Sequence, residues 1–217
     1  MGKRGPKPRG KVVIKWGPEF AYAIGLLVAD GCLSKDGRHI DLTSKDEEQL
    51  HTFNKCLGIT ATISKKFSGS GNMAYRIQFG DVLFYKFLLK IGLSAAKSKT
   101  ISAVLIPRYY FFDFLRGYFD GDGCSYSFYD SVFQNSFRFY ISFASGSLKY
   151  IKWLRRKLNA FADIKGHVCK QSNSSNFQLK YAKKEAVILA HKMYYENKLA
   201  CLSRKKLKID NALSIIG

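Results

Sequence analysis

Two stretches of this sequence end an apolar run, rich in small residues, with an Asp-Gly pair. The first is Ala23–Gly31, which carries Asp30, and the second is Leu115–Gly123, which carries Asp122. If each stretch is a helix, its aspartate meets the negative end of the helix dipole, which costs about 0.3–1 kcal/mol. A divalent cation between two such carboxylates would offset that cost, and oxygen ligands suit Mg²⁺. The duplication therefore predicts a metal site shared by two helices.

Small residues at helical spacing indicate how these two helices are arranged. Ala21, Gly25 and Ala29 fall at i, i+4 and i+8, and Gly117 and Gly121 repeat part of this stripe. A glycine inside a helix costs roughly 1 kcal/mol relative to alanine, so its presence suggests a packing reason. We expect the two helices to pack against each other with their backbones in close approach.

The composition points to a polyanionic partner. The 217 residues contain 36 Lys and Arg against 16 Asp and Glu, which gives a net charge of +20 and a pI near 9.8. No apolar run approaches the roughly 18 residues of a membrane span. The five cysteines form no CxxC pair and the four histidines lack zinc-ligand spacing, so we expect reduced, mostly packed cysteines. Nucleic acid is favoured over a membrane surface, in a protein of a prokaryotic cytoplasm or an organelle matrix.

The order of predicted elements repeats once along the chain. In the first half we expect a helix over 18–30, strands over 32–35 and 38–43, a helix from a Ser44–Glu47 capping box to 57, strands over 61–66 and 74–79, and a helix over 81–91. In the second half we expect a helix over 109–122, strands over 124–129 and 137–143, a helix from Ser145 or Ser147 to about 160, strands over 164–170 and 177–181, and a helix over 183–195. The fold class is α+β, with two pseudo-symmetric αββαββα half-domains.

Equivalent positions in the two halves keep a nearly constant spacing. Asp30 and Asp122 are 92 residues apart, whereas Ser44 and Ser145, and also Lys97 and Lys198, are 101 residues apart. A longer hairpin loop over 130–136 accounts for the difference. The expected organisation is a basic flexible arm over 1–17, half-domains over 18–97 and 109–210, a linker over 98–108 and a tail over 211–217.

The two Asp-Gly stretches resemble the motif of the LAGLIDADG homing endonucleases in the single-chain, two-motif form. The order helix, hairpin, helix, hairpin, helix follows that family over about residues 18–210. Both copies keep the motif's Gly at position three and its Asp-Gly at positions eight and nine. Val28 replaces the acid at position six, and Arg116 replaces the small second residue. The resemblance implies two four-stranded antiparallel DNA-binding sheets joined by the paired motif helices.

The resemblance also implies the chemistry of the site. It makes the chain a sequence-specific endonuclease that hydrolyses phosphodiesters across the minor groove of a long double-stranded DNA target, leaving short 3′ overhangs. The expected metal ligands are Asp30 and Asp122, with the backbone carbonyls of Ala29 and Gly121, and the expected metal is Mg²⁺, with Ca²⁺ or Mn²⁺ as substitutes. Polar and basic residues at the family's other catalytic positions are Ser44 and Ser145, then Lys198 and either Lys97 or Lys99.

Alternation along the strands predicts which side chains face DNA. Arg and Gln reach guanine and adenine edges in the major groove, which admits a two-stranded ribbon. The candidate base-reading residues are His39, Asp41, Thr62, Ser64, Lys66, Arg76, Gln78, Arg138, Tyr140, Ser142, Lys170, Gln178 and Lys180. The basic residues Arg204, Lys205, Lys206 and Lys208 are expected to contact phosphates, and the stretch Arg4–Arg9 is a candidate minor-groove arm.

Two other functions fit the same pattern. An intron RNA-splicing maturase on this fold would favour structured RNA, and a non-cleaving DNA-binding protein would use the sheets without the acids. Retention of both Asp30 and Asp122 favours the endonuclease. Because both halves lie in one chain, we expect a monomer that reads an asymmetric site.

Overall fold

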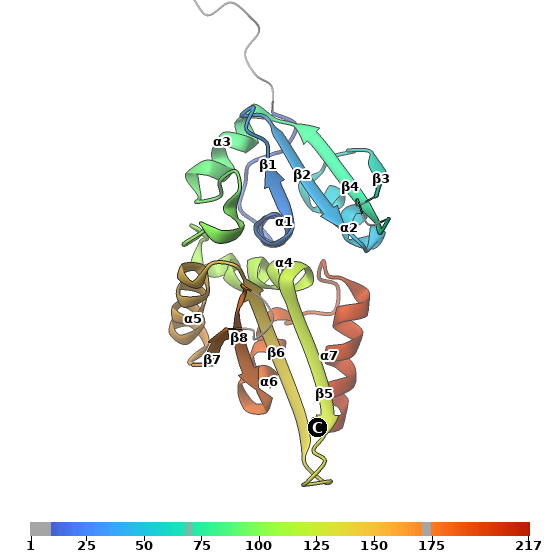
Figure 1. Cartoon of the computed structure of the whole chain (residues 1–217), viewed down its shortest axis with the longest axis vertical. Coiled ribbons are helices and arrows are strands. Elements are labelled where there is room, and N and C mark those ends of the chain that lie inside the picture. The colour runs from blue at the N-terminus through green and yellow to red at the C-terminus, as the bar shows by residue number, and fades with distance from the viewer. Residues whose placement is uncertain (1–9, 68, 70, 171–174) are drawn as a thin grey trace, which may run out of the picture.

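The two halves of the chain are stacked on each other, with helices α1 and α4 at their junction (Figure 1). The computed structural model describes residues 10–67, 69, 71–170 and 175–217. The candidate minor-groove stretch Arg4–Arg9 lies outside the described residues. In the described part of the chain, no helix is long and apolar enough to cross a membrane.

Each half has the predicted order of elements. The first contains α1 (Pro18–Ala29), β1 (Gly31–Leu33), β2 (His39–Ser44), α2 (Glu47–Leu57), β3 (Ile63–Phe67), β4 (Met73–Gly80) and α3 (Val82–Lys90). The second contains α4 (Phe111–Asp122), β5 (Gly123–Tyr129), β6 (Phe137–Ser145), α5 (Leu148–Ala162), β7 (His167–Lys170), β8 (Phe177–Ala182) and α6 (Lys183–Met193). Single turns of 3₁₀ helix lie at Lys97–Lys99 and Arg108–Tyr110, and a last helix, α7, covers Ser203–Ile216.

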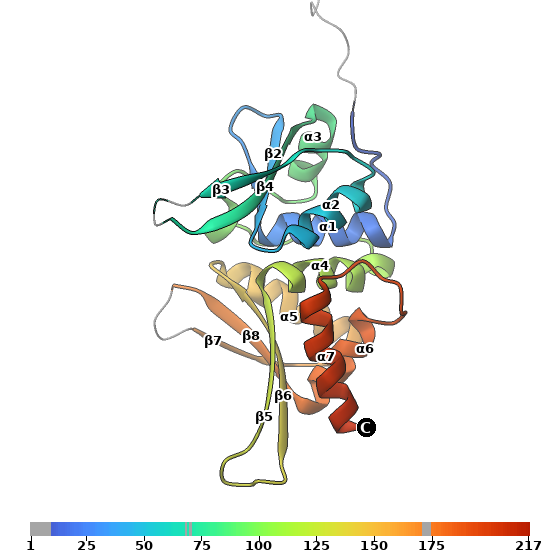
Figure 2. The ribbon, with the colours of Figure 1, turned by 90° about the vertical axis from the view of Figure 1, so that its right-hand side faces the viewer.

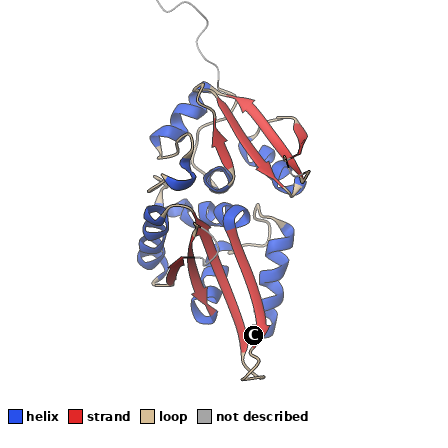
Figure 3. Ribbon diagram, in the orientation of Figure 1, coloured by secondary structure: helices blue, strands red, loops and turns tan. Residues whose placement is uncertain are grey.

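Each half builds one antiparallel four-stranded sheet. The strand orders are β1-β2-β4-β3 and β5-β6-β8-β7, so the two sheets have the same topology. The secondary-structure colouring separates the strands from the helices that pack on them (Figure 3), and a side view shows the helices on one side of each sheet (Figure 2). The other face of each sheet is left open. This arrangement confirms the predicted α+β class and the pseudo-symmetric halves.

Alternating apolar residues place the core on the helix side of each sheet. In the first sheet Ile40, Leu42 and Ile77 are fully or almost fully buried, and their neighbours along the strands point to the open face. In the second sheet Phe143 and Leu179 have the equivalent positions and are fully buried. The period-2 pattern of the sequence is therefore the reason for the open polar faces.

The helices α1 and α4 pack against each other as the small-residue stripe predicts. A Cβ atom on Gly25 would lie 2.1 Å from the backbone oxygen of Phe114, and one on Gly117 would lie 2.0 Å from that of Tyr22. Near the end of the seam, a Cβ atom on Gly121 would lie 2.3 Å from the Cβ atom of Ala29. No side chain fits at these positions, so glycine permits a backbone approach that brings the two helix ends together.

Segments that follow the last helix of each half pack on the opposite half. Ser147, in the second half, donates a hydrogen bond to the backbone oxygen of Ile101, with 2.5 Å between the atoms. In the reciprocal contact, Arg204 at the start of α7 pairs with Asp46 of the first half at 2.7 Å. These crossed contacts hold the halves in one arrangement around the α1–α4 seam.

Three details of the predicted elements were wrong. Ser44 does not cap α2, because the helix begins at Glu47 after Asp46 and the Ser44 hydroxyl instead bonds to Gln49. The predicted tail 211–217 is mostly helical, since α7 continues to Ile216. All five cysteines are free thiols, as expected. Only Cys56 is buried, however, so the expectation that most of them are packed in the core was wrong.

Candidate active site at the ends of the paired helices

The two motif aspartates lie at the C-terminal ends of α1 and α4. Asp30 follows α1 and is half-buried, while Asp122 is the last residue of α4 and is exposed. Among the described residues, neither carboxylate accepts a hydrogen bond or forms an ion pair. Two acids without partners therefore meet where the close helix packing ends.

Two buried lysines flank these acids. The ammonium group of Lys97 donates to the backbone oxygen of Gly31, the residue that follows Asp30. The ammonium group of Lys205 donates at 2.7 Å to the backbone oxygen of Gly123, the residue that follows Asp122. Both lysines are less than a tenth exposed. They are therefore equivalents under the pseudo-symmetry of the chain.

The predicted basic residue of the second half was wrong. Lys198 is exposed and lies in the segment between α6 and α7, where it lines a separate cavity with Trp16 and Tyr195. Lys205, and not Lys198, occupies the position in the second half that is equivalent to that of Lys97. In the first half the structure favours Lys97 over Lys99, because Lys97 is buried beside the site and Lys99 is exposed.

Among the cations near the two acids, the lysine of the opposite half lowers the pKa of each acid most. Burial and the neighbouring charge of Asp122 raise the pKa of Asp30 to about 7, and Lys205 is the cation that opposes this rise most. Burial also raises the pKa of Asp122, although part of its side chain reaches solvent, and there Lys97 is the strongest opposing cation. Burial also disfavours the charged form of the two lysines, and it lowers the pKa of both Lys97 and Lys205.

A cavity of about 210 Å³ lies beside Asp122. Lys97 and Ser145 line it together with Tyr118 and Tyr150. The Tyr118 hydroxyl donates to the backbone oxygen of Ala144 at 2.5 Å. The structure thus brings together the predicted residues Asp122, Lys97 and Ser145.

The two predicted serines differ in their surroundings. Ser145 lines the cavity, and its hydroxyl oxygen accepts a hydrogen bond from the Ser147 backbone at 3.1 Å. Ser44 is buried and donates to the Gln49 side chain at 2.5 Å. Ser44 therefore has an internal partner, whereas Ser145 stands at the site.

A third aspartate of the second motif has a structural position. Asp120 is buried, and one of its carboxylate oxygens accepts hydrogen bonds from the Tyr22 hydroxyl at 2.8 Å and the Leu202 backbone at 2.7 Å. Burial raises the pKa of Asp120 to about 6. It joins α1, α4 and the start of α7 instead of facing the other two acids.

The first half matches a known domain family. Residues 17–92 match the model of the LAGLIDADG-like domain. No curated protein sequence gives a significant match to this chain. The structure extends the likeness to the whole chain through solved structures.

Several solved structures share the architecture of both halves. The homing endonuclease I-WcaI bound to its DNA recognition sequence is similar with a TM-score of 0.64 and 13% identity, over 95% of this chain and 95% of that one. The I-LtrWI LAGLIDADG homing endonuclease bound to target DNA has a TM-score of 0.59 and 13% identity, over 91% of this chain and 89% of that one. This chain has the two-motif LAGLIDADG fold. Full-length WhiA from Thermatoga maritima gives a TM-score of 0.58 and 16% identity over 94% of this chain, which spans only 63% of WhiA.

The ends of the LAGLIDADG helices offer oxygen ligands for a hard divalent cation. Asp30 and Asp122 are acids without internal partners, and the expected carbonyls of Ala29 and Gly121 lie at the same helix ends. In the described part of the chain, no group of three His, Cys, Asp or Glu side chains forms a metal site. The donors fit Mg²⁺ better than zinc, which favours nitrogen and sulfur ligands. The Gly121 carbonyl already accepts a hydrogen bond from Lys205 at 3.1 Å.

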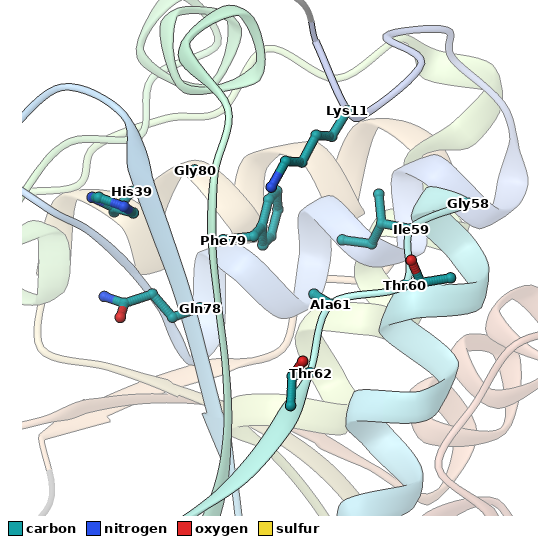
Figure 4. Close-up of a pocket in the computed structure, with 10 residues that line it drawn as sticks. All are labelled: Lys11, His39, Gly58, Ile59, Thr60, Ala61, Thr62, Gln78, Phe79 and Gly80. Carbon is teal, nitrogen blue, oxygen red and sulfur yellow. The ribbon is translucent and has the colours of Figure 1, made fainter.

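Strand register places most of the predicted base-reading residues on the open faces of the LAGLIDADG sheets. In the first sheet Asp41 is opposite Gln78, Ser64 is opposite Arg76, and His39 is opposite Gly80, so all of them share the open face. Continuing this register puts Lys66 and Thr62 there as well. His39, Thr62 and Gln78 line a cavity of about 610 Å³ at one end of the sheet, which Lys11 also borders (Figure 4).

In the second sheet one predicted residue is on the wrong face. Arg138, Tyr140, Ser142, Gln178 and Lys180 share the open face. Lys170 pairs with Phe177 and therefore points to the core side, whereas its neighbour Cys169 pairs with Gln178 and shares the open face. Ser142 is on the predicted face but is buried beneath its neighbours.

Proposed function

We propose that this chain is a sequence-specific, metal-dependent endonuclease of double-stranded DNA, of the homing endonuclease type. The observation that carries the proposal is the cluster at the helix ends. Asp30 and Asp122 lie at the ends of α1 and α4 without internal partners, and the buried lysines Lys97 and Lys205 bond to the glycine carbonyls that follow them. Similarity to homing endonucleases bound to DNA supports the same function. The net charge of +20 suits a polyanionic substrate.

The arrangement of side chains is suited to the hydrolysis of two phosphodiesters. Asp30 and Asp122 would hold divalent cations at the seam, and the cations would supply Lewis acidity and an activated water molecule. Lys97 and Lys205 place one positive charge on each side of the acids, where each can stabilise negative charge on a phosphate. The two-fold relation of the pairs matches the two strands of a duplex. We propose that cleavage occurs across the minor groove and leaves short 3′ overhangs.

Substitution of the two acids tests this proposal. A duplex target is first selected from a randomised library with Ca²⁺, and cleavage of that target is then measured with Mg²⁺. We expect Asp30→Asn and Asp122→Asn each to reduce cleavage by 10³-fold or more while Ca²⁺-dependent or metal-free binding persists. Asp163→Asn removes an exposed carboxylate at the end of α5 and serves as the matched control. Unreduced cutting by either active-site variant would overturn the proposal.

One contact favours a second candidate, a non-cleaving nucleic-acid-binding protein. Lys205 donates to the carbonyls of Phe119, Gly121 and Gly123. The Gly121 carbonyl, one of the expected metal ligands, is therefore already hydrogen-bonded to an ammonium group. If this contact persists in the complex, the chain would bind duplex DNA or intron RNA without cutting it. Tight binding of the selected duplex, with no cleavage in Mg²⁺ or Mn²⁺, would select this candidate.

A further inference from the structure

The open faces of the two sheets differ in chemistry although their strands are equivalent. In the first sheet Arg76 pairs with Asp41, but Gln78 and Lys66 are exposed and have no hydrogen-bond or ion-pair partner among the described residues. In the second sheet, Tyr140 replaces His39, and the longer strands β5 and β6 add two further aromatic residues, Tyr126 and Phe128. The halves therefore present different surfaces to a bound duplex.

Three rings on the second sheet form one aromatic cluster. The Tyr126 and Tyr140 ring centroids lie 5.0 Å apart with 19° between the planes. Phe128 stacks on both, at 6.4 Å from Tyr126 and 6.2 Å from Tyr140. Phe128 is 47% exposed, and both tyrosines are partly exposed. Since no helix of the described residues covers this face (Figure 2), the cluster is an accessible apolar surface on a basic protein.

The hydrogen-bonding side chains around this aromatic cluster already have partners. Arg138 pairs with Asp130 at 3.0 Å, and Gln178 donates to the Ser142 hydroxyl at 3.1 Å. The Lys180 ammonium lies 5.6 Å from the Tyr126 ring centroid and 5.8 Å from that of Tyr140. These groups would lose their internal partners if they turned to a base edge. Apolar contact is therefore what this face offers most readily.

In the major groove, the apolar group of a base pair is the C5-methyl of thymine. We propose that the second sheet recognises a thymine-containing half-site through contact of Tyr126, Tyr140 and Phe128 with thymine methyl groups. The first sheet reads its own half-site by hydrogen bonds. This inference rests on the proposed function, because it assumes that the open faces enter the major groove of a duplex.

Replacement of thymine by uracil tests the inference, because it removes the methyl group and leaves base pairing unchanged. The selected duplex is prepared with uracil in one half-site at a time, and binding is measured in Ca²⁺ to prevent cleavage. One buried methyl corresponds to about a 4-fold change in affinity. We expect substitution of the thymines in one half-site to weaken binding at least 10-fold, and substitution in the other to change it less than 2-fold.

A double variant assigns the methyl-sensitive half-site to the second sheet. Tyr126→Ser/Tyr140→Ser removes two of the three rings, so replacement of thymine by uracil in that half-site should weaken its binding by less than about 4-fold, against at least 10-fold for the wild type. Gln78→Ala, on the first sheet, is the matched control and should keep the sensitivity to uracil. Circular dichroism and chemical denaturation of the double variant establish that it is folded before its binding is compared.

The outcomes separate this inference from the proposed function. Failure to bind any selected duplex would overturn the proposed function, and the inference with it. Tight duplex binding that is insensitive to uracil in both half-sites, or sensitivity that is undiminished in the double variant, would overturn the inference alone. Ring-dependent preference for single-stranded DNA or RNA over the duplex would also overturn it, since aromatic rings would then be stacking on unpaired bases.

Discussion

Lys97 and Lys205 are structural equivalents, each bonded through its ammonium group to the glycine carbonyl that follows the motif aspartate of its own half. Lys97 bonds to Gly31 and Lys205 bonds to Gly123. Both lysines also lower the pKa of both acids, and for each acid the lysine of the opposite half has the larger effect. A cluster built in this way requires both halves to be in place. The arrangement of the four residues therefore depends on the packing of α1 against α4.

Replacing Lys205 should affect cleavage far more than replacing Lys198. Lys205→Met keeps an apolar stem in the buried position but removes the charge that opposes the high pKa of Asp30. We expect cleavage to fall by about 10²–10³-fold and the remaining activity to require a higher pH, because Asp30 would then stay protonated to a higher pH. Rates of cutting of the selected duplex between pH 6 and pH 9 would measure both effects. Lys198→Met is the control, and an equal loss in that variant would contradict the assignment.

Lys198 was predicted in place of Lys205 because the spacing between equivalent residues of the two halves is not constant. The two halves are offset by 101 residues at Ser44 and Ser145, but Lys97 and Lys205 are 108 residues apart. The segment between α6 and α7 accounts for the extra residues, and a constant offset cannot include it. The burial of Lys205 is not predictable from the local pattern either, because both adjacent residues, Arg204 and Lys206, are also basic.

Short-range patterns predicted the scaffold well because they depend on local chemistry. The Gly25 and Gly117 spacing predicted the helix seam, and strand alternation predicted the open face for all but one of the candidate base-reading residues. The error at Lys170 arose because local alternation does not show which residue of β7 pairs with Gln178; Cys169 does, so Lys170 faces the core side. Register depends on pairing between strands that are separated in the sequence, so alternation along a single strand does not predict it.

Without metal, Asp30 should make the protein less stable as the pH rises. Its folded pKa of about 7 exceeds the ordinary value of 3.8, so the folded state binds more protons between these pH values and loses stability as they are released. Asp30→Asn removes this penalty. We expect the variant to gain about 2–4 kcal/mol relative to the wild type between pH 4 and pH 8, after allowance for partial exposure of the site. Denaturant titrations in EDTA would measure the difference, and parallel pH curves would contradict it.

A methyl group at either seam glycine should separate the paired helices. In Gly25→Ala the new Cβ would lie 2.1 Å from the Phe114 backbone oxygen, and in Gly117→Ala it would lie 2.0 Å from that of Tyr22. Because rigid backbone atoms must move, we expect a loss of roughly 3 kcal/mol or more in the free energy of unfolding, together with lower cleavage. Gly17→Ala is the matched control, since its Cβ would meet no atom within 4 Å. Unchanged denaturation midpoints in both seam variants would contradict the packing argument.

Two cysteines provide a test of which faces meet DNA. Cys32 and Cys124 are exposed, and each pairs across its sheet with a residue of the open face, Asp41 or Ser142. If duplex DNA covers both open faces, the selected target should slow alkylation of both thiols by at least 10-fold, as measured by mass spectrometry of peptides after iodoacetamide treatment. Cys56 is buried and burial raises its pKa to about 12, so it should react slowly with or without DNA. Protection of one thiol without the other would show that only one sheet engages the duplex, because the two cysteines occupy equivalent positions beside Asp30 and Asp122.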